Sequence, residues 1–180
     1  MFKKVVQTLT AGGILLEPGL TYKELRMVEK IYNINFPKSF RKFLRGCLPV
    51  SKGFYNWRDF SDENVAKIKA VMARPGEAVF ESVRDIYWCD AWGEKPNTDE
   101  ETIQRILEKL EDAPKLIPIY GHRYMPAEGK NPPVLSVYDL DMIYYGKDLY
   151  DYFMVEFGGK KQQSIEFKSI PEVTFWSDIM

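Results

Sequence analysis

The chain has 180 residues, 45% of them hydrophobic and 14% aromatic, a size and composition that predict a folded core and exclude a disordered chain. No apolar run approaches the roughly 20 residues of a membrane-spanning helix, so we expect no membrane partner. The first residues resemble a signal peptide only weakly, because polar residues interrupt the apolar part and no cleavage site follows. Cys47 and Cys89 predict reduced thiols in a cytoplasmic protein and exclude a disulfide framework.

The net charge is −1, but the charges are unevenly distributed. Residues 1–58 contain 11 Lys/Arg and 3 Asp/Glu (+8), whereas residues 59–180 contain 14 Lys/Arg and 23 Asp/Glu (−9). Such asymmetry indicates either two binding faces or two halves that neutralise each other by packing together. For a single domain we favour mutual neutralisation.

Helices dominate the predicted structure of the first part of the chain. A short amphipathic helix ends at Gly12-Gly13, and Glu17-Pro18-Gly19 predicts a turn. Thr21 and Glu24 then form a capping box, in which each side chain accepts a hydrogen bond from a free amide of the first turn. A helix is therefore expected to begin directly after Thr21.

The next predicted helix is the clearest amphipathic segment, and Pro37 suits its first position. Its apolar face consists of Phe40, Phe43, Leu44 and Cys47. Its opposite face consists of Lys38, Arg41, Lys42 and Arg45. Four bases could bind phosphates, but no aromatic residue is interleaved with them and the whole chain is not basic. We interpret this face as solvated and expect no nucleic-acid partner.

Two further helices follow. Ser61 caps the first, with Asp62 and Glu63 in its first turn, and Thr98 and Glu101 form a capping box for the second. The residues expected on their inner faces are Val65, Ile68 and Met72 in the first helix and Ile103, Ile106, Leu107 and Leu110 in the second.

Strands are predicted after Pro114. The segments rich in β-forming residues are Leu116–Tyr120, Val134–Tyr138 and Met142–Tyr145. Residues 124–133 are expected to form a loop, and the turn Asp139-Leu140-Asp141 predicts an antiparallel hairpin.

The last part of the chain predicts three more elements. Asp148 caps a short helix that ends at Gly158-Gly159. Ile165–Lys168 predicts a final strand, and Pro171–Met180 a closing helix with inward-facing Val173 and Trp176. Helices followed by consecutive strands indicate an α+β fold.

Motifs for catalysis are sparse. His122 is the only histidine, and a nucleophilic mechanism needs a base beside a Ser, Cys or Thr. Gly121-His122-Arg123 ends a predicted strand, where a histidine can serve catalysis or stabilise a turn. Without a partner motif, a small hydrolase centred on His122 is our least favoured hypothesis, and we predict no catalytic residues.

No metal site or cofactor is predicted either. His122, Cys47 and Cys89 lack zinc-ligand spacing, and the calcium-loop and phosphate-loop patterns are absent. Asp139 and Asp141 could share one side of a strand, but a polar rim is a better interpretation than a glycosidase pair.

Aromatic and acidic residues remain as the strongest signal. Trp88 and Trp92 lie four residues apart, with Asp90 and Glu94 beside them. Tryptophan supplies large contact areas and acids set specificity, which is typical of binding surfaces; burial of both tryptophans in the core is the open alternative. The predicted partner-binding residues are Trp88, Asp90, Trp92, Glu94, Asp139, Asp141, Asp148 and Asp151.

Two segments carry a family resemblance. The first contains Leu20-Thr21, Glu24, Val28-Glu29, Asn35-Phe36-Pro37, Phe40, Phe43-Leu44 and Gly53-Phe54-Tyr55-Asn56-Trp57. The second contains Leu116–Tyr124, Pro133–Tyr138, Asp141 and Ile143-Tyr144-Tyr145-Gly146. From about residue 20 to residue 157 the chain thereby resembles the SUKH superfamily, which is related to a yeast cell-wall synthesis regulator and abundant in bacteria.

The resemblance implies one SUKH-like domain over residues 1–180, with an antiparallel or mixed central sheet flanked by helices. It also implies a non-enzymatic role, because many bacterial members are immunity proteins that bind and neutralise toxins, often nucleases. The motif residues are expected to be structural: Pro37, Gly53, Trp57, Gly121, His122 and Gly146. We therefore expect a protein partner, a cognate toxin; the alternative is a regulatory or scaffold protein in cell-envelope physiology.

Overall fold

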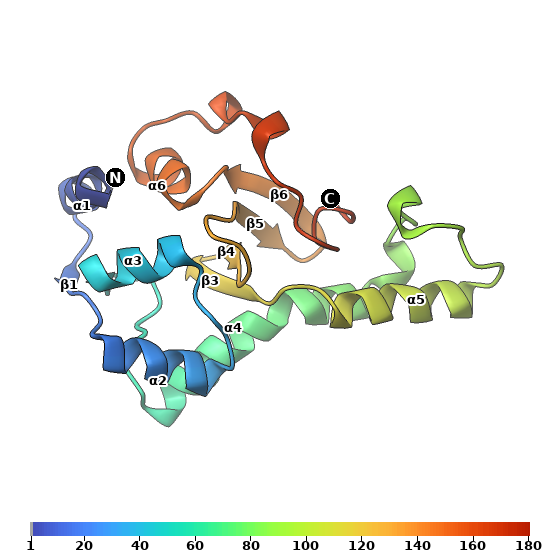
Figure 1. The fold of residues 1–180 in the computed structure, drawn as a ribbon, viewed down its shortest axis with the longest axis horizontal. Coiled ribbons are helices and arrows are strands. Elements are labelled where there is room, and N and C mark those ends of the chain that lie inside the picture. Colours follow the sequence, from blue (N-terminus) through green and yellow to red (C-terminus); the bar gives the residue numbers. More distant parts are fainter. Residues whose placement is uncertain (1) are drawn as a thin grey trace.

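The computed structural model describes residues 2–180 and contains six α-helices and two antiparallel sheets (Figure 1). The helices are α1 (Phe2–Ala11), α2 (Tyr22–Tyr32), α3 (Lys38–Gly46), α4 (Asp62–Glu81), α5 (Asp99–Glu111) and α6 (Leu149–Phe157). Short 3₁₀ helices are η1 (Val83–Asp85), η2 (Asp90–Trp92), η3 (Gln162–Ser164) and η4 (Phe167–Ser169). The predicted α+β class is confirmed.

The larger sheet is an antiparallel meander in the order β3-β4-β5-β6. Its strands are β3 (Leu116–Tyr120), β4 (Arg123–Pro126), β5 (Val134–Tyr138) and β6 (Asp141–Gly146). The predicted hairpin between the last two strands is confirmed, since Tyr138 pairs with Asp141 across the turn. The smaller sheet pairs β1 (Leu16–Pro18) with β2 (Cys47–Pro49).

Local signals account for the helix ends. The predicted capping box is present: the Thr21 amide donates to the Glu24 carboxylate (2.7 Å) and the Glu24 amide donates to the Thr21 hydroxyl (3.2 Å). In α5 the Thr98 hydroxyl accepts from the Glu101 amide, but no reciprocal bond to the Glu101 carboxylate forms among the described residues. The second predicted capping box is thus only half formed. Pro37 precedes α3 as its N-cap and is not the first helical residue.

Three predicted elements are wrong. Glu17 and Pro18 lie in β1, not in a turn, because β2 supplies the pairing strand. Residues 124–126 belong to β4, not to a loop. Pro126 is tolerated there because β4 pairs with β5 only through Arg123 and Tyr124, which leaves the proline free of that ladder. Two 3₁₀ turns flank Ile165 where a strand was predicted.

The predicted C-terminal helix is the fourth error. Residues 174–179 form turns, and Phe175 adopts a left-handed backbone with φ 67°, which interrupts a helix. This conformation lets the Phe175 ring stack on Trp92, with centroids 6.0 Å apart. Val173 and Trp176 are buried as predicted, and the Trp176 indole N–H donates to the Pro114 carbonyl.

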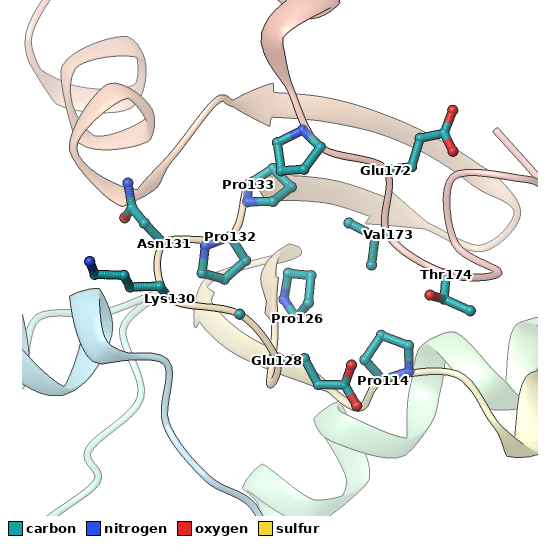
Figure 2. Close-up of a pocket in the computed structure, with 12 residues that line it drawn as sticks. Pro114, Pro126, Glu128, Lys130, Asn131, Pro132, Pro133, Glu172, Val173 and Thr174 are labelled. Atoms are coloured by element: carbon teal, nitrogen blue, oxygen red, sulfur yellow. The ribbon is translucent and has the colours of Figure 1, made fainter.

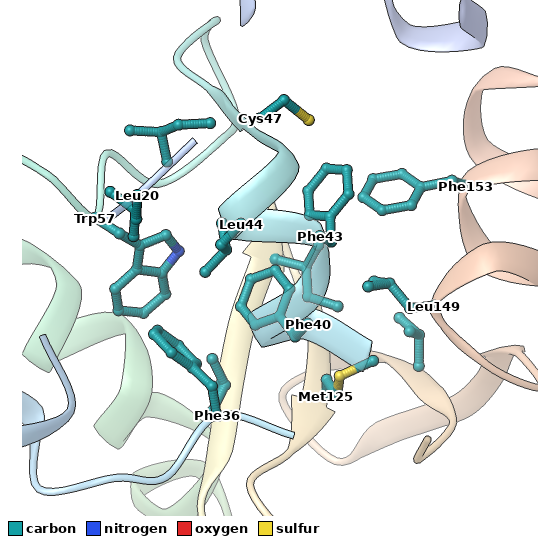
Figure 3. Close-up of a cluster of buried hydrophobic side chains, with 14 of the residues drawn as sticks. Leu20, Phe36, Phe40, Phe43, Leu44, Cys47, Trp57, Met125, Leu149 and Phe153 are labelled. Carbon is teal, nitrogen blue, oxygen red and sulfur yellow. The ribbon is translucent and has the colours of Figure 1, made fainter. Parts of the chain in front are cut away.

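Two hydrophobic clusters hold the fold together. The first surrounds α3, where aromatic residues of its inner face meet Trp57 on one side and α6 on the other (Figure 3). The second joins α4, α5 and the sheet to the C-terminal segment. Figure 1 shows α4 running from beside α2 past the sheet to the far side of the molecule, where α5 lies. The molecule therefore has two distinct ends.

The ion pairs are also divided between the two parts of the chain. Each of the eight ion pairs among residues 2–180 joins two residues of segment 2–58 or two of segment 59–180. Among the described residues no ion pair therefore joins the two halves, which favours separate binding faces over mutual neutralisation.

Among the described residues, no helix combines the length and the apolarity that a membrane crossing would require.

Candidate binding surface

The Trp88–Glu94 segment lies in the connection between α4 and α5. The two indole rings meet edge to face, with centroids 5.4 Å apart, and both tryptophans are half-buried. The Trp88 indole N–H donates to the Gly93 carbonyl and the Trp92 indole N–H donates to the Asp178 carboxylate, each at 2.8 Å. Trp92 and Trp88 pack against the second hydrophobic cluster. The rings are thus fixed in place while part of each stays accessible.

This segment belongs to an acidic arm, which we define as residues 77–112. The arm comprises the end of α4, η1, η2 and α5 and contains 11 Asp/Glu and 4 Lys/Arg, a net charge of −7. Asp90 and Glu94 are exposed within it. Its one ion pair among the described residues joins Arg105 to Glu108 on the surface of α5. Most of the carboxylates of the arm therefore face solvent without a cationic partner.

The hairpin between β5 and β6 carries two more predicted residues, Asp139 and Asp141, both exposed. Asp139 occupies the turn with φ 52°, a left-handed conformation that Asp tolerates better than most residues. Its carboxylate lies 3.9 Å from the Arg74 guanidinium in an exposed, weak pair. Leu140 at the tip packs against the same cluster as Trp92. Six of the eight predicted residues therefore lie on two segments that pack against the second hydrophobic cluster: Trp88, Asp90, Trp92, Glu94, Asp139 and Asp141.

Asp148 and Asp151 have different roles. Asp148 caps α6 by accepting from the Asp151 amide at 2.8 Å and also accepts from the Asn131 amide group. Asp151 is buried, with 5% exposed, and its carboxylate pairs with Lys160 and accepts from the Lys147 amide. These carboxylates stabilise the start of α6, and the buried Asp151 offers no free charge to a partner.

His122 lies beside a cavity of about 220 Å³, where its ring meets Tyr138 edge to face at 6.2 Å. The cavity is lined by Tyr55, Val71, Arg74, Pro75, Gly121, His122, Tyr124, Val137, Tyr138 and Asp139. Partial burial, and secondarily the charge of Arg123, lower the pKa of His122 below its ordinary 6.5, which favours the neutral imidazole. No Ser, Cys or Thr is among the residues that line this cavity.

A larger hollow of about 360 Å³ lies between Pro114, the 126–133 segment and residues 171–174 (Figure 2). Its walls include five prolines: Pro114, Pro126, Pro132, Pro133 and Pro171. Prolines lack an amide N–H, so these five positions are rigid and contribute no backbone donor, whereas Glu128, Lys130, Asn131, Glu172 and Thr174 add polar groups to the walls. The 171–174 wall leads directly to Phe175, on which Trp92 stacks. Sequence reasoning missed this hollow because its walls come from three distant segments.

No group of three or more His, Cys, Asp or Glu side chains within residues 2–180 is arranged to hold a metal ion. Comparison of the chain with protein-family models, with curated proteins and with solved structures found no match. The resemblance to the SUKH superfamily therefore stays a prediction.

Proposed function

We propose that this chain is a non-enzymatic binding protein that recognises a basic protein partner through its acidic arm. The observation that carries the proposal is the Trp88–Trp92 pair, two half-buried rings fixed by hydrogen bonds inside a segment of net charge −7. Pre-oriented aromatic rings bury much area on binding at little entropic cost, and they dominate the energetics of many interfaces. The surrounding carboxylates add attraction for a positively charged surface and increase its association rate.

The resemblance supplies the class of the partner. Immunity proteins neutralise toxins by binding them, and toxins that act on nucleic acids need basic surfaces for their substrates. An acidic arm complements such a surface. We therefore propose a cognate bacterial toxin, in particular a nuclease, as the partner.

The proposal is tested by capturing partners from the native host with the tagged protein and identifying them by mass spectrometry. We expect a stoichiometric complex with a toxin that dissociates as the salt concentration rises, because exposed charge pairs are screened. The double variant Asp90→Lys/Glu94→Lys should lose the complex. Recovery of envelope-synthesis proteins instead would favour the regulatory alternative.

A matched control variant distinguishes an effect of the acidic arm from an effect of the net charge of the whole chain. Glu63→Lys/Glu128→Lys changes the net charge equally at two exposed residues outside the arm and outside any ion pair of the described chain. This control should retain the complex. A second double variant, Asp139→Asn/Asp141→Asn, tests the hairpin without straining the left-handed turn, since Asn also tolerates that conformation. Equal capture by all three variants and the unchanged protein would contradict the assignment to the arm.

A further inference from the structure

A basic surface lies at the end of the molecule opposite the acidic arm. Helices α2 and α3 run antiparallel there and are joined by a short loop (Figure 1). The surface is formed by exposed bases of these two helices: Lys23, Arg26, Lys30, Lys38, Lys42 and Arg45. On each helix the bases lie opposite the buried face, which is formed by Leu25, Val28 and Tyr32 in α2 and by Phe40, Phe43 and Leu44 in α3.

Two contacts hold the rows of bases side by side. The Arg45 guanidinium lies over the Tyr22 ring, 3.5 Å from its centroid, and joins the end of α3 to the start of α2. Arg41 pairs with Glu29 at 3.2 Å and joins the start of α3 to the end of α2. The spacing of bases in the sequence indicates a basic face on α3 alone. The structure adds a second basic helix beside it.

The acids of this half are all paired with Arg58 or Arg41, outside the basic surface. Residues 1–58 contain only three, Glu17, Glu24 and Glu29. Glu17 and Glu24 both pair with Arg58, and Glu29 pairs with Arg41. None of the six bases of the surface is in an ion pair among the described residues. The six bases are therefore available to an anionic ligand.

The chemistry of the surface narrows the class of ligand. Helices that bind a lipid surface stably combine their bases with an apolar face that inserts, but the apolar faces of α2 and α3 are buried in the first cluster. The centre of a specific protein interface is typically apolar, whereas the exposed residues of these helices are mainly charged and include only two large hydrophobic side chains, Tyr22 and Met27. Nucleic-acid interfaces, by contrast, are polar and strongly positive.

The basic surface favours a nucleic-acid duplex over a single strand as its ligand. Proteins that bind single strands stack bases on exposed aromatic rings. The aromatic residue at this surface is Tyr22, and one face of its ring is covered by Arg45. We propose that the basic surface binds the phosphate backbone of a nucleic-acid duplex without sequence preference. This inference does not depend on the proposed function, because a different surface carries it.

The geometry suits such a ligand. In each row the first and last bases are seven residues apart, which corresponds to about 10 Å along the helix. Six phosphate contacts give a slope of about −5 for the logarithm of the association constant against the logarithm of the salt concentration. Dissociation constants of about 1–100 µM at physiological salt are typical of binding of this kind.

The test uses the full chain and fluorescently labelled 20-base-pair DNA duplexes of two unrelated sequences, with anisotropy measured from 50 to 200 mM salt. We expect similar affinities for both sequences and the steep slope given above. The triple variant Lys30→Gln/Lys38→Gln/Lys42→Gln should bind about tenfold or more weakly, with the slope reduced to about −2 to −3. These lysines make no ion pair among the described residues, so folding should be preserved, which circular dichroism checks.

The matched control removes the same charge elsewhere. Lys95→Gln/Lys161→Gln/Lys168→Gln changes three exposed lysines outside both helices, and it should bind as the unchanged protein does. Equal weakening by the two triples, or no duplex binding at 50 mM salt, overturns the proposal. So does self-association in sedimentation that the first triple abolishes without affecting DNA binding, because the surface would then receive the acidic arm of a second copy.

Discussion

Tryptophans serve different purposes at the two ends of this molecule. Trp57 is 2% exposed, and Tyr32 and Phe36 meet its ring edge to face with centroids 5.3 and 5.2 Å away (Figure 3). Trp88 and Trp92, by contrast, are half-buried in the acidic arm and are held by hydrogen bonds from their indole N–H groups. At one end the tryptophan is enclosed by other aromatic rings. At the other end the two tryptophans are held by hydrogen bonds at the ring edge, and part of each ring stays accessible.

The difference teaches that residue type alone does not assign a tryptophan to core or interface. Around Trp57 the neighbours are apolar, so the ring contributes to stability by burial. Around Trp92 one neighbour is the Asp178 carboxylate, and Lys109 lies 5.6 Å from the ring centroid. An aromatic ring kept rigid among charges suits recognition of a partner. Substitutions at both ends can test this division.

The largest loss of stability is expected from a substitution of Trp57. Replacing it with alanine removes the ring around which Tyr32, Phe36 and Phe40 are arranged and should lower the free energy of unfolding by about 3–5 kcal/mol. Urea denaturation followed by circular dichroism measures this change. Tyr87→Ala, at a side chain that is 91% exposed, is the control and should change stability by less than about 0.5 kcal/mol.

A smaller loss of stability is expected at Trp92. Trp92→Ala removes the stacking on Phe175 and the hydrogen bond to Asp178, which together contribute about 1–3 kcal/mol. Binding of the proposed partner should fall much more, because the accessible part of the ring is lost as well. Trp92→Phe keeps the ring stacking and should restore most of the stability. A loss of stability as large as that of Trp57→Ala, with partner capture intact, would make Trp92 an ordinary core residue.

Features set by neighbours in sequence were predictable. The Thr21–Glu24 capping box, the buried face of α3 and the bounds of β3 and β5 all depend on local spacing, and the structure confirms them. The pairing of β1 with β2 was missed because each strand has only three residues and no local signal. Phe175 likewise adopts its left-handed backbone where its ring meets Trp92, far away in sequence.

The residues of the candidate binding surface could likewise be predicted from the sequence only in part, because tertiary contacts decide which of them are free. Asp90 and Asp151 are both acids near aromatic residues, yet one is exposed and the other is buried against Lys160. Composition indicates charge but not which carboxylates a helix cap or an ion pair already uses. The basic surface was missed for a related reason. It depends on α2 lying beside α3, and the contact of Arg45 with Tyr22 spans 23 positions that no periodicity connects.

The smallest expected effect on stability is at Glu24 in the first turn of α2. It is compared with Glu101, which has the equivalent position in α5 at the other end of the molecule. Hydrogen bonds from the Thr21 amide and from Arg58 lower the pKa of Glu24 from 4.5 to about 2. Because the pKa in the folded state is below the unfolded value, the Glu24 carboxylate stabilises the fold above about pH 4.5, and this contribution disappears as the pH falls towards 2. Glu24→Gln should therefore cost about 1 kcal/mol at pH 7 and little near pH 2.

Glu101 provides the matched control. It occupies the same position after a capping threonine in α5, but its carboxylate makes no bond to the Thr98 amide among the described residues. Both substitutions remove one negative charge from a first helical turn, so their shared effect on the helix dipole cancels in the comparison. Urea denaturation between pH 7 and pH 2.5 should show that Glu24→Gln removes more of the pH dependence than Glu101→Gln. Identical pH profiles would mean that the Glu24 hydrogen bonds contribute nothing beyond charge at a helix start, and that this difference between the two ends does not exist.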